Sequence, residues 1–267
     1  MVGGGYIIKR AIQLLVPFIV YSILTWTFWG GCSPVEVLLK PSKGLWFLLV
    51  LYNLNIAIIF ICYLNKKYIS NVTLCILLSY VFLLLLAGIF KDVLAAHLTA
   101  YYFPYFLGGL YLKRCFQKNE LTNVKLSCCS LIIWLFMAYY WQVDAAPLFF
   151  NSINSPVILK IIMYLWHYTT AILAIYGFLG LFRTIFDKNI KSVLFVGRNT
   201  LGIYALHFYM LNILSPIDGY FDTSSFHYVL IMLFLTISMS LLTIRLIKYN
   251  KYLSFLLLGI PLNKKIK

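Results

Sequence analysis

Residues 72–90 read VTLCILLSYVFLLLLAGIF and contain no charged side chain. An α-helix rises about 1.5 Å per residue, so a helix of this length extends over about 28 Å, close to the roughly 30 Å hydrocarbon core of a bilayer. A backbone in lipid must satisfy its own hydrogen bonds, and the stretch lacks the alternating pattern of a barrel strand. The sequence therefore predicts a membrane-spanning helix here.

The composition of the whole chain agrees with this prediction. Of the 267 residues, 63% are hydrophobic and 11% are charged, whereas soluble domains are about half apolar and a quarter charged. These values exclude a soluble domain. The net charge of +15 does not indicate binding to nucleic acid, because nucleic-acid-binding proteins carry their basic residues on a polar surface that this sequence barely has.

Similar apolar runs recur along the chain. We expect one all-α, polytopic membrane domain over residues 1–267 with about eight transmembrane helices. The run at 200–214 is short, and the run at 95–112 contains Pro104, which kinks a helix. The predicted spans cover residues 11–29, 45–64, 72–90, 95–112, 126–141, 161–182, 200–214 and 226–246.

The basic residues predict the orientation of these spans. If the amino terminus is cytoplasmic, 18 of the 22 Lys and Arg residues lie on the cytoplasmic side. The four on the other side are Lys40, Lys43, Lys91 and Lys160. Such a bias is the positive-inside pattern, so we expect both termini in the cytoplasm.

The predicted spans contain no Asp or Glu in their interiors. Proton relays and cation-coupled transporters usually depend on buried carboxylates, so this absence argues against both. The adjacent Cys128 and Cys129 lack the spacing of metal ligands, and we interpret them as small buried hydrophobic residues. No metal site is predicted.

Two residues of the span at 200–214 are candidates for catalysis. His207 lies about 10 Å into this span, and Tyr204 lies about one turn before it on the same face. A neutral imidazole can act as a general base. The alternative is a structural histidine that bonds a neighbouring helix, and the sequence leaves both open.

The other three histidines receive structural interpretations. His167 lies in the span at 161–182 and is read as structural or as lining a cavity. His97 and His227 lie near the predicted outer boundary and are read as solvated interfacial residues.

Three arginines at span boundaries can bind a polyanionic cofactor through its phosphates: Arg10, Arg114 and Arg198. The alternative is that they serve the topology and contact anionic lipids.

Four motifs of the sequence resemble those of the integral-membrane acyltransferase 3 family, which comprises bacterial O-acetyltransferases of surface glycans. They occur in the order KRAIQLLVP at 9–17, LWFL at 45–48, YFPYFLGGLYL at 102–112 and GRNTLGIYALH at 197–207. Each motif is weak alone, but together they extend over nearly the whole chain. The resemblance implies transfer of an acyl group from a cytoplasmic acyl-CoA, typically acetyl-CoA, to a carbohydrate hydroxyl at or beyond the outer face.

The resemblance also implies several further features. Arg10, Arg114 and Arg198 would hold the phosphates of the acyl-CoA co-substrate, with no cofactor permanently bound. The expected partners are the carbohydrate acceptor, acyl-CoA and membrane lipids, and the expected location is the bacterial cytoplasmic membrane. His207 and Tyr204 stay the candidate catalytic residues on their own spacing, because no residue of this chain matches the family's usual histidine by motif.

The chain departs from the family pattern at its amino-terminal end. Family members usually have ten spans, and the basic motif with its proline leads into the third, so two spans are expected to be missing. The first of these usually carries the intramembrane histidine of the family, and Gln13 stands where a second basic residue is common. We therefore keep an alternative: a non-catalytic membrane protein, such as a truncated paralogue, a glycan transporter or a partner of a complete enzyme.

Overall fold

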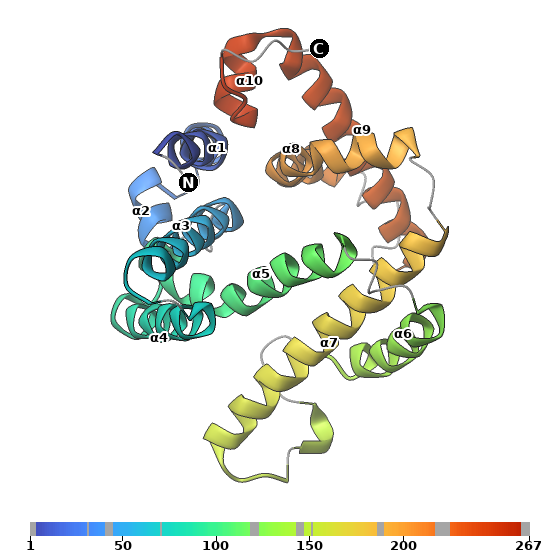
Figure 1. The fold of residues 1–267 in the computed structure, drawn as a ribbon. Coiled ribbons are helices and arrows are strands. Elements are labelled where there is room, and N and C mark those ends of the chain that lie inside the picture. The colour runs from blue at the N-terminus through green and yellow to red at the C-terminus, as the bar shows by residue number, and fades with distance from the viewer. Residues whose placement is uncertain are drawn as a thin grey trace. The chain divides into compact units, whose positions relative to one another are not determined.

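The structure is a computed structural model that describes residues 4–30, 32–40, 45–69, 71–117, 123–142, 147–150, 152–185, 190–216 and 225–262. Within these ranges the regular elements are helices, with no strand (Figure 1). The chain forms two compact units. Unit 1 comprises residues 1–106 and 192–267, and unit 2 comprises residues 107–191.

Most helices of the structure belong to unit 1. Its elements are α1 (Gly4–Trp29), α2 (Pro34–Leu39), α3 (Trp46–Lys67), α4 (Val72–Phe90), the 3₁₀ turn η2 (Val93–Ala95), the first half of α5 (Ala96–Gln117), α8 (Lys191–Leu214, from residue 192), α9 (Phe226–Tyr249) and α10 (Lys251–Leu258).

Polar residues at the predicted boundaries explain where several helices begin. Asn71 accepts hydrogen bonds from the backbone N–H groups of Thr73 and Leu74 at the start of α4. Asn250 does the same for Tyr252 and Leu253 at the start of α10. These side chains satisfy N–H groups that have no partner within the helix, and they therefore separate one apolar run from the next.

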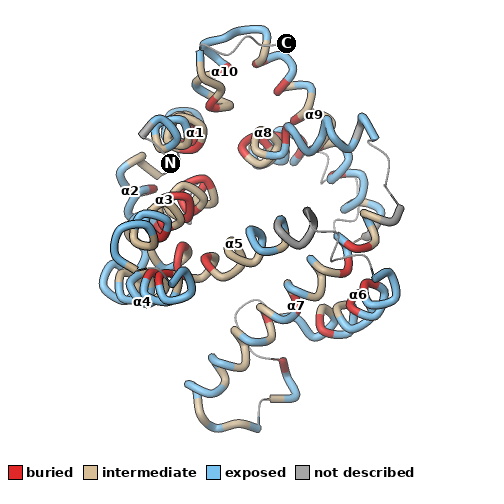
Figure 2. Tube along the Cα trace, in the orientation of Figure 1, coloured by how far each residue is buried: buried red, intermediate tan, exposed pale blue. Residues whose placement is uncertain are grey.

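Helix α1 lies at the centre of the packing in unit 1. It packs against α3 on one side and against α10 on the other (Figure 1). Leu14 and Phe18 of α1 and Leu48 and Val50 of α3 are almost fully buried. Figure 2 shows buried positions where α1, α3 and α8 face one another.

A glycine allows α10 to end against α1. Gly259 has φ +62°, and a Cβ atom there would lie 2.6 Å from both the Cα and the carbonyl oxygen of Gln13. The left-handed backbone ends the helix, and the missing side chain permits direct contact with the α1 backbone.

Helices α8 and α9 touch at two points. A Cβ atom on Gly202 would lie 2.8 Å from the Cδ1 atom of Ile244. Nearer the start of α8, the Lys248 ammonium donates to the Asn199 side-chain oxygen at 2.7 Å.

Unit 2 is built on a helical hairpin. Its described elements are the end of α5, α6 (Val124–Tyr139), the 3₁₀ turn η3 (Leu148–Phe150) and α7 (Pro156–Ile185). Gly177 and Gly180 of α7 bring the two long helices together, because Cβ atoms there would lie 2.6 Å from the Leu131 Cγ atom and 1.9 Å from the Ser127 Oγ atom. Small residues at such spacing are typical of helix contacts in membranes.

Five helices in the described part of the chain are long and apolar enough to cross a membrane. They are Gly5–Phe28, Trp46–Lys67, Val72–Phe90, Pro156–Arg183 and His227–Tyr249. Their outer faces are strongly apolar: Leu77 and Leu85 of α4 are 58% and 61% exposed. A lipid environment accounts for such faces, and the chain is a multi-pass membrane protein.

Each of the eight predicted spans lies largely within a helix of the structure. The predicted spans at 95–112, 126–141 and 200–214 correspond to α5, α6 and α8, which are not among the five long apolar helices. Helix α6 is short, with 16 residues, whereas α5 is rich in tyrosine and glycine and α8 begins with polar residues. The number of eight spans and the orientation therefore stay predictions. The prediction missed α2 and α10, which are too short to show a membrane signal.

Candidate functional site

Helix α8 presents two candidate catalytic side chains next to each other. Tyr204 and His207 lie one turn apart, with their ring centroids 5.4 Å apart. Both side chains are partly buried. The structure thus brings together the two residues that the sequence predicted on one face.

The backbone of α8 determines which His207 nitrogen is available. The Nδ1 atom is hydrogen-bonded to the backbone carbonyl oxygen of Tyr204. Because a carbonyl oxygen can only accept, Nδ1 carries the proton in this contact, and in the neutral ring the Nε2 atom keeps a lone pair. An imidazole held in this tautomer can take a proton at Nε2.

The Tyr204 hydroxyl binds the first turn of α3. The backbone N–H of Phe47 donates to the Tyr204 oxygen at 3.3 Å, and the two rings meet edge to face with centroids 5.2 Å apart. The first N–H groups of a helix have no partner within that helix, so Tyr204 satisfies one of them. The phenol keeps its own proton and can still donate it.

Further aromatic rings of α3 and α5 lie beside this contact. Trp46, at the start of α3, stacks on Tyr102 of α5 with centroids 5.4 Å apart. Tyr102 in turn packs against Tyr101 and Tyr105. The LWFL and YFPYF motifs, far apart in the sequence, thus meet beside Tyr204.

A second polar contact joins α1 to α8 further along α8, after Tyr204. The hydroxyl groups of Thr25 and Tyr209 lie 2.7 Å apart, and the Tyr209 hydroxyl donates to the backbone oxygen of Tyr21 at 3.1 Å. The Tyr21 and Tyr209 rings are 5.3 Å apart. Tyr209 lies five residues after Tyr204 on α8, so these contacts with α1 help to hold the helix that carries Tyr204.

Arg10 is engaged in a chain of polar contacts along α1. Its Nε donates to the Tyr6 hydroxyl at 3.0 Å and its Nη1 donates to Gln13 at 3.2 Å. The Tyr6 hydroxyl donates to Asn55 of α3 at 3.1 Å. A guanidinium with these partners links α1 to α3, and a phosphate would have to use its remaining donors.

The structure describes the other two predicted phosphate-binding arginines to different extents. Arg198 is exposed near the start of α8. The side chain of Arg114 lies outside the described residues, and its position in the chain belongs to unit 2. The neighbour of Arg198, Asn199, is 5% exposed and accepts the hydrogen bond from Lys248.

Comparison with known proteins decides the family. The acyltransferase 3 model, described as an acyltransferase domain, matches residues 2–245. The chain belongs to the acyltransferase 3 family. No curated protein and no solved structure matches the chain. The family assignment expected from the four motifs is therefore confirmed, and it supports a membrane acyltransferase-like function.

Sequence reasoning missed two contributors to the site of this acyltransferase 3 family member. Lys248 was counted only as a cytoplasmic charge. Its pairing with Asn199 depends on where α8 and α9 meet, which no local sequence pattern reports. The Thr25–Tyr209 contact joins residues 184 positions apart. Its only signal was the presence of polar groups within apolar runs.

The remaining histidines of the family member differ in burial. His167 is 4% exposed, stacks on Trp141 at 4.1 Å and pairs its Nε2 atom with the Gln142 carbonyl oxygen at 2.9 Å. His97 and His227 are exposed. Across the described ranges, no group of three His, Cys, Asp or Glu side chains is arranged to hold a metal ion.

Proposed function

We propose that the chain is an O-acyltransferase of the bacterial cytoplasmic membrane. It takes an acyl group, acetyl in the simplest case, from acyl-CoA and transfers it to a hydroxyl of a cell-surface or lipid-linked carbohydrate. The family match over residues 2–245 supports the reaction class. The single observation that carries the proposal is the His207–Tyr204 pair, with Nδ1 of the imidazole tied to the backbone and the phenol tied to α3.

In this proposal His207 is the general base. Its Nε2 takes the proton of the acceptor hydroxyl while that oxygen attacks the acyl carbonyl carbon. The negative charge that develops on the carbonyl oxygen is stabilised by the Tyr204 O–H, which donates to it. When the intermediate collapses, the carbon–sulfur bond breaks and the CoA thiolate takes the proton from His207. The products are the carbohydrate ester and free CoA.

Basic residues at the helix ends are proposed to receive the CoA phosphates. Arg198 is exposed near the start of α8. Lys248 donates to the buried Asn199, and Arg10 offers the donors that its α1 contacts leave unused. Arg114 joins them in this proposal on its charge and its place in the sequence alone. Charge-assisted hydrogen bonds from such groups are the usual means of holding phosphates.

The test is the acyl-ester content of surface glycan in bacterial cells that express the chain. We expect ester with the unchanged chain and a loss of about 100-fold or more in the initial rate for His207→Ala, since general bases contribute about 10² to 10⁴. His227→Ala is the control, because His227 is exposed on α9. Absence of ester with every variant would contradict the proposal and would favour a non-catalytic membrane protein.

A further inference from the structure

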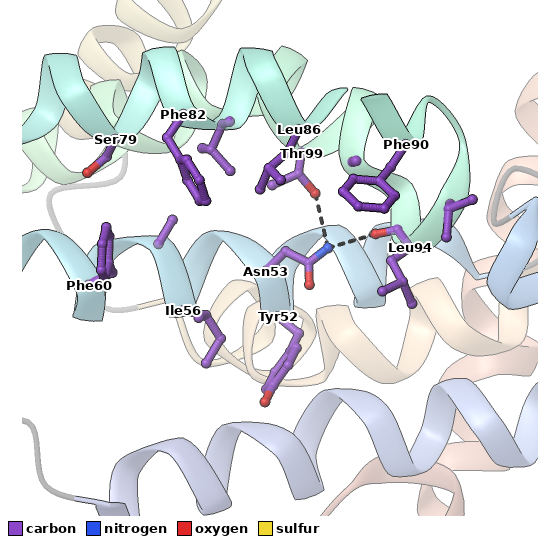
Figure 3. Close-up of a pocket in the computed structure, with 14 residues that line it drawn as sticks. Tyr52, Asn53, Ile56, Phe60, Ser79, Phe82, Leu86, Phe90, Leu94 and Thr99 are labelled. Atoms are coloured by element: carbon purple, nitrogen blue, oxygen red, sulfur yellow. Dashed lines mark hydrogen bonds between the residues drawn. The ribbon is translucent and has the colours of Figure 1, made fainter. Parts of the chain in front are cut away.

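Unit 1 contains a large pocket on the side of α3 that faces α4. Its volume is about 700 Å³, and it lies between α3, α4, η2 and the start of α5 (Figure 3). Its walls are chiefly apolar, with Phe60, Phe82, Leu86 and Phe90 among the lining side chains. We call this space the tail pocket. Ligand pockets in proteins have volumes of about 300–1,000 Å³, so the tail pocket can hold a sizeable molecule.

The tail pocket is elongated along the helices. On α4 its lining extends from Ser79 to Phe90, which corresponds to about 16 Å at 1.5 Å per residue. This is about half of the roughly 30 Å hydrocarbon core. The length thus matches a hydrocarbon chain that enters from one leaflet.

One end of the tail pocket is formed by a strained turn. Between α4 and α5, three residues other than glycine have left-handed backbone angles: Lys91 (φ 48°), Leu94 (φ 51°) and Ala95 (φ 57°). Asn53 holds this turn, because its side-chain amide donates to the Leu94 oxygen at 2.9 Å and to the Thr99 hydroxyl at 3.1 Å (Figure 3). Each such angle costs about 1–3 kcal/mol, and such strain concentrates at ligand-binding sites.

The other end carries a buried polar atom. The side chain of Ser79 is 3% exposed and lines the tail pocket. Within the described part of the chain its hydroxyl has no hydrogen-bond partner. Buried hydroxyl groups are nearly always paired, so a bound molecule is expected to approach this atom. The double bonds of an unsaturated chain are weak acceptors for such a donor, whereas a saturated chain offers none.

The strained turn carries exposed charged and titratable residues. Lys91 directly follows Phe90, and His97 directly follows Ala96, both of which line the tail pocket. Lys91, His97 and the carboxylate of Asp92 are exposed. A lipid phosphate at this end would contact the Lys91 ammonium. The hydrocarbon tail of that lipid would extend into the pocket and be buried against its apolar walls.

The strained end also lies close to the aromatic cluster at Tyr204. On α3, Asn53 is two turns, or about 10 Å, from Trp46, and on α5, Thr99 is less than one turn from Tyr102. Trp46 and Tyr102 stack on each other. A group attached to the phosphate of a bound lipid can therefore reach the candidate catalytic pair.

We propose that the tail pocket binds the unsaturated hydrocarbon tail of a phosphate-bearing lipid that carries the acceptor carbohydrate. This inference rests on the proposed function and narrows its acceptor to a lipid-linked glycan. Lys91 contacts the phosphate, Asn53 holds the turn that shapes the mouth, and Ser79 lies beside the inner part of the chain. The carbohydrate extends from the mouth toward Tyr204 and His207.

Photolabelling tests the site without requiring catalysis. The probe is an isoprenyl-diphosphate monosaccharide with a diazirine in its tail, added to the full chain in vesicles of phosphatidylethanolamine and phosphatidylglycerol. We expect labelled peptides from residues 52–60 and 79–90. Ser79→Leu fills the inner end, and overpacking by about 1–3 kcal/mol corresponds to a loss of labelling of about 5- to 150-fold.

The matched control is Gly88→Leu, which adds bulk to the same helix at an exposed position with nothing within 4 Å of the new Cβ. Its labelling should stay unchanged. If Ser79→Leu fails to fold, as judged by thermal unfolding, Ala96→Leu fills the other end of the pocket. A second probe is the uncharged isoprenol with the same diazirine. Lys91→Gln should lower labelling by the diphosphate probe and leave labelling by this uncharged probe unchanged.

Two results would overturn the inference. One is equal labelling in the Ser79 and Gly88 variants. The other is labelling of the same peptides by a diazirine phospholipid, equally strong and not reduced by an excess of the lipid-linked sugar. This result would mean that bulk lipid fills the pocket. Because labelling needs no acyl-CoA, labelling without ester transfer contradicts only the proposed function. Ester transfer to a water-soluble glycan without labelling contradicts only this inference.

Discussion

Three glycines of unit 1 allow backbone strain and close packing to be measured separately. Gly259 has φ +62° and would place a Cβ atom 2.6 Å from the Gln13 backbone. Gly30 has φ +63° but nothing within 4 Å of its Cβ position. Gly88 lies inside α4, with an ordinary helical backbone and open space around it. A change to alanine therefore meets both backbone strain and a steric clash at Gly259, backbone strain alone at Gly30, and neither at Gly88.

The expected changes in the free energy of unfolding follow from these surroundings. Gly30→Ala should cost about 1–2 kcal/mol, the price of a left-handed angle for a residue with a Cβ atom. Gly259→Ala should cost that amount plus about 1–3 kcal/mol of overpacking, or roughly 2–5 kcal/mol, because the atoms it meets are rigid backbone. Gly88→Ala should gain about 0.5–1 kcal/mol, since alanine loses less entropy in a helix.

The assay is reversible unfolding in mixed micelles, followed by tryptophan fluorescence, with all three variants prepared side by side. The expected order of stability is Gly88→Ala, unchanged chain, Gly30→Ala and Gly259→Ala. Equal stability of the Gly30 and Gly259 variants would mean that α10 does not close against α1 at Gln13. A Gly259 variant as stable as the unchanged chain would refute the reasoning as a whole.

Three further predictions concern contacts between helices. Tyr204→Phe removes the acceptor of an α3 backbone N–H and should lower the free energy of unfolding by about 1–3 kcal/mol; a smaller loss in the same micelle assay would mean that water replaces the phenol. Lys248→Met leaves the buried Asn199 oxygen without this donor and should cost a similar amount. In a double-mutant cycle with Asn199→Ala the two losses should not add, and full additivity would show that the pair does not interact. Gly180→Ala places a Cβ atom 1.9 Å from the Ser127 oxygen and should lower the melting temperature of unit 2, whereas adding Ser127→Gly should restore most of it; no restoration would argue against this α6–α7 contact.

Long apolar runs made the helices predictable. The run at 72–90 coincides with α4, because Asn71 caps its first turn and Lys91 follows its last residue. The predicted start at residue 200 was nine residues late for α8, since Gly197, Arg198 and Asn199 read as a boundary although their backbone is helical. Polar side chains are tolerated in a helix when they bond locally, as Asn199 does to the Phe195 oxygen at 2.7 Å.

The candidate site was predictable only in part. Tyr204 and His207 share a face because of helical spacing alone, so the sequence predicted their proximity. The contact of Tyr204 with Phe47 joins residues 157 positions apart, and no periodicity reports it. The three arginines were grouped because each lies at a span boundary, but this property says nothing of which helix ends lie together. Arg10 instead bonds Tyr6 and Gln13 on its own helix.

By itself the sequence determined the environment, the helical class and the family of this protein. Lipid leaves a backbone no hydrogen-bond partner except itself, so an apolar run of sufficient length has few alternatives to a helix. The tertiary structure decided which faces of those helices meet, because membrane helices associate through close packing and interhelical hydrogen bonds. Gly259 against Gln13, Tyr204 against Phe47 and the tail pocket beside Asn53 all depend on shapes that form only when distant segments come together.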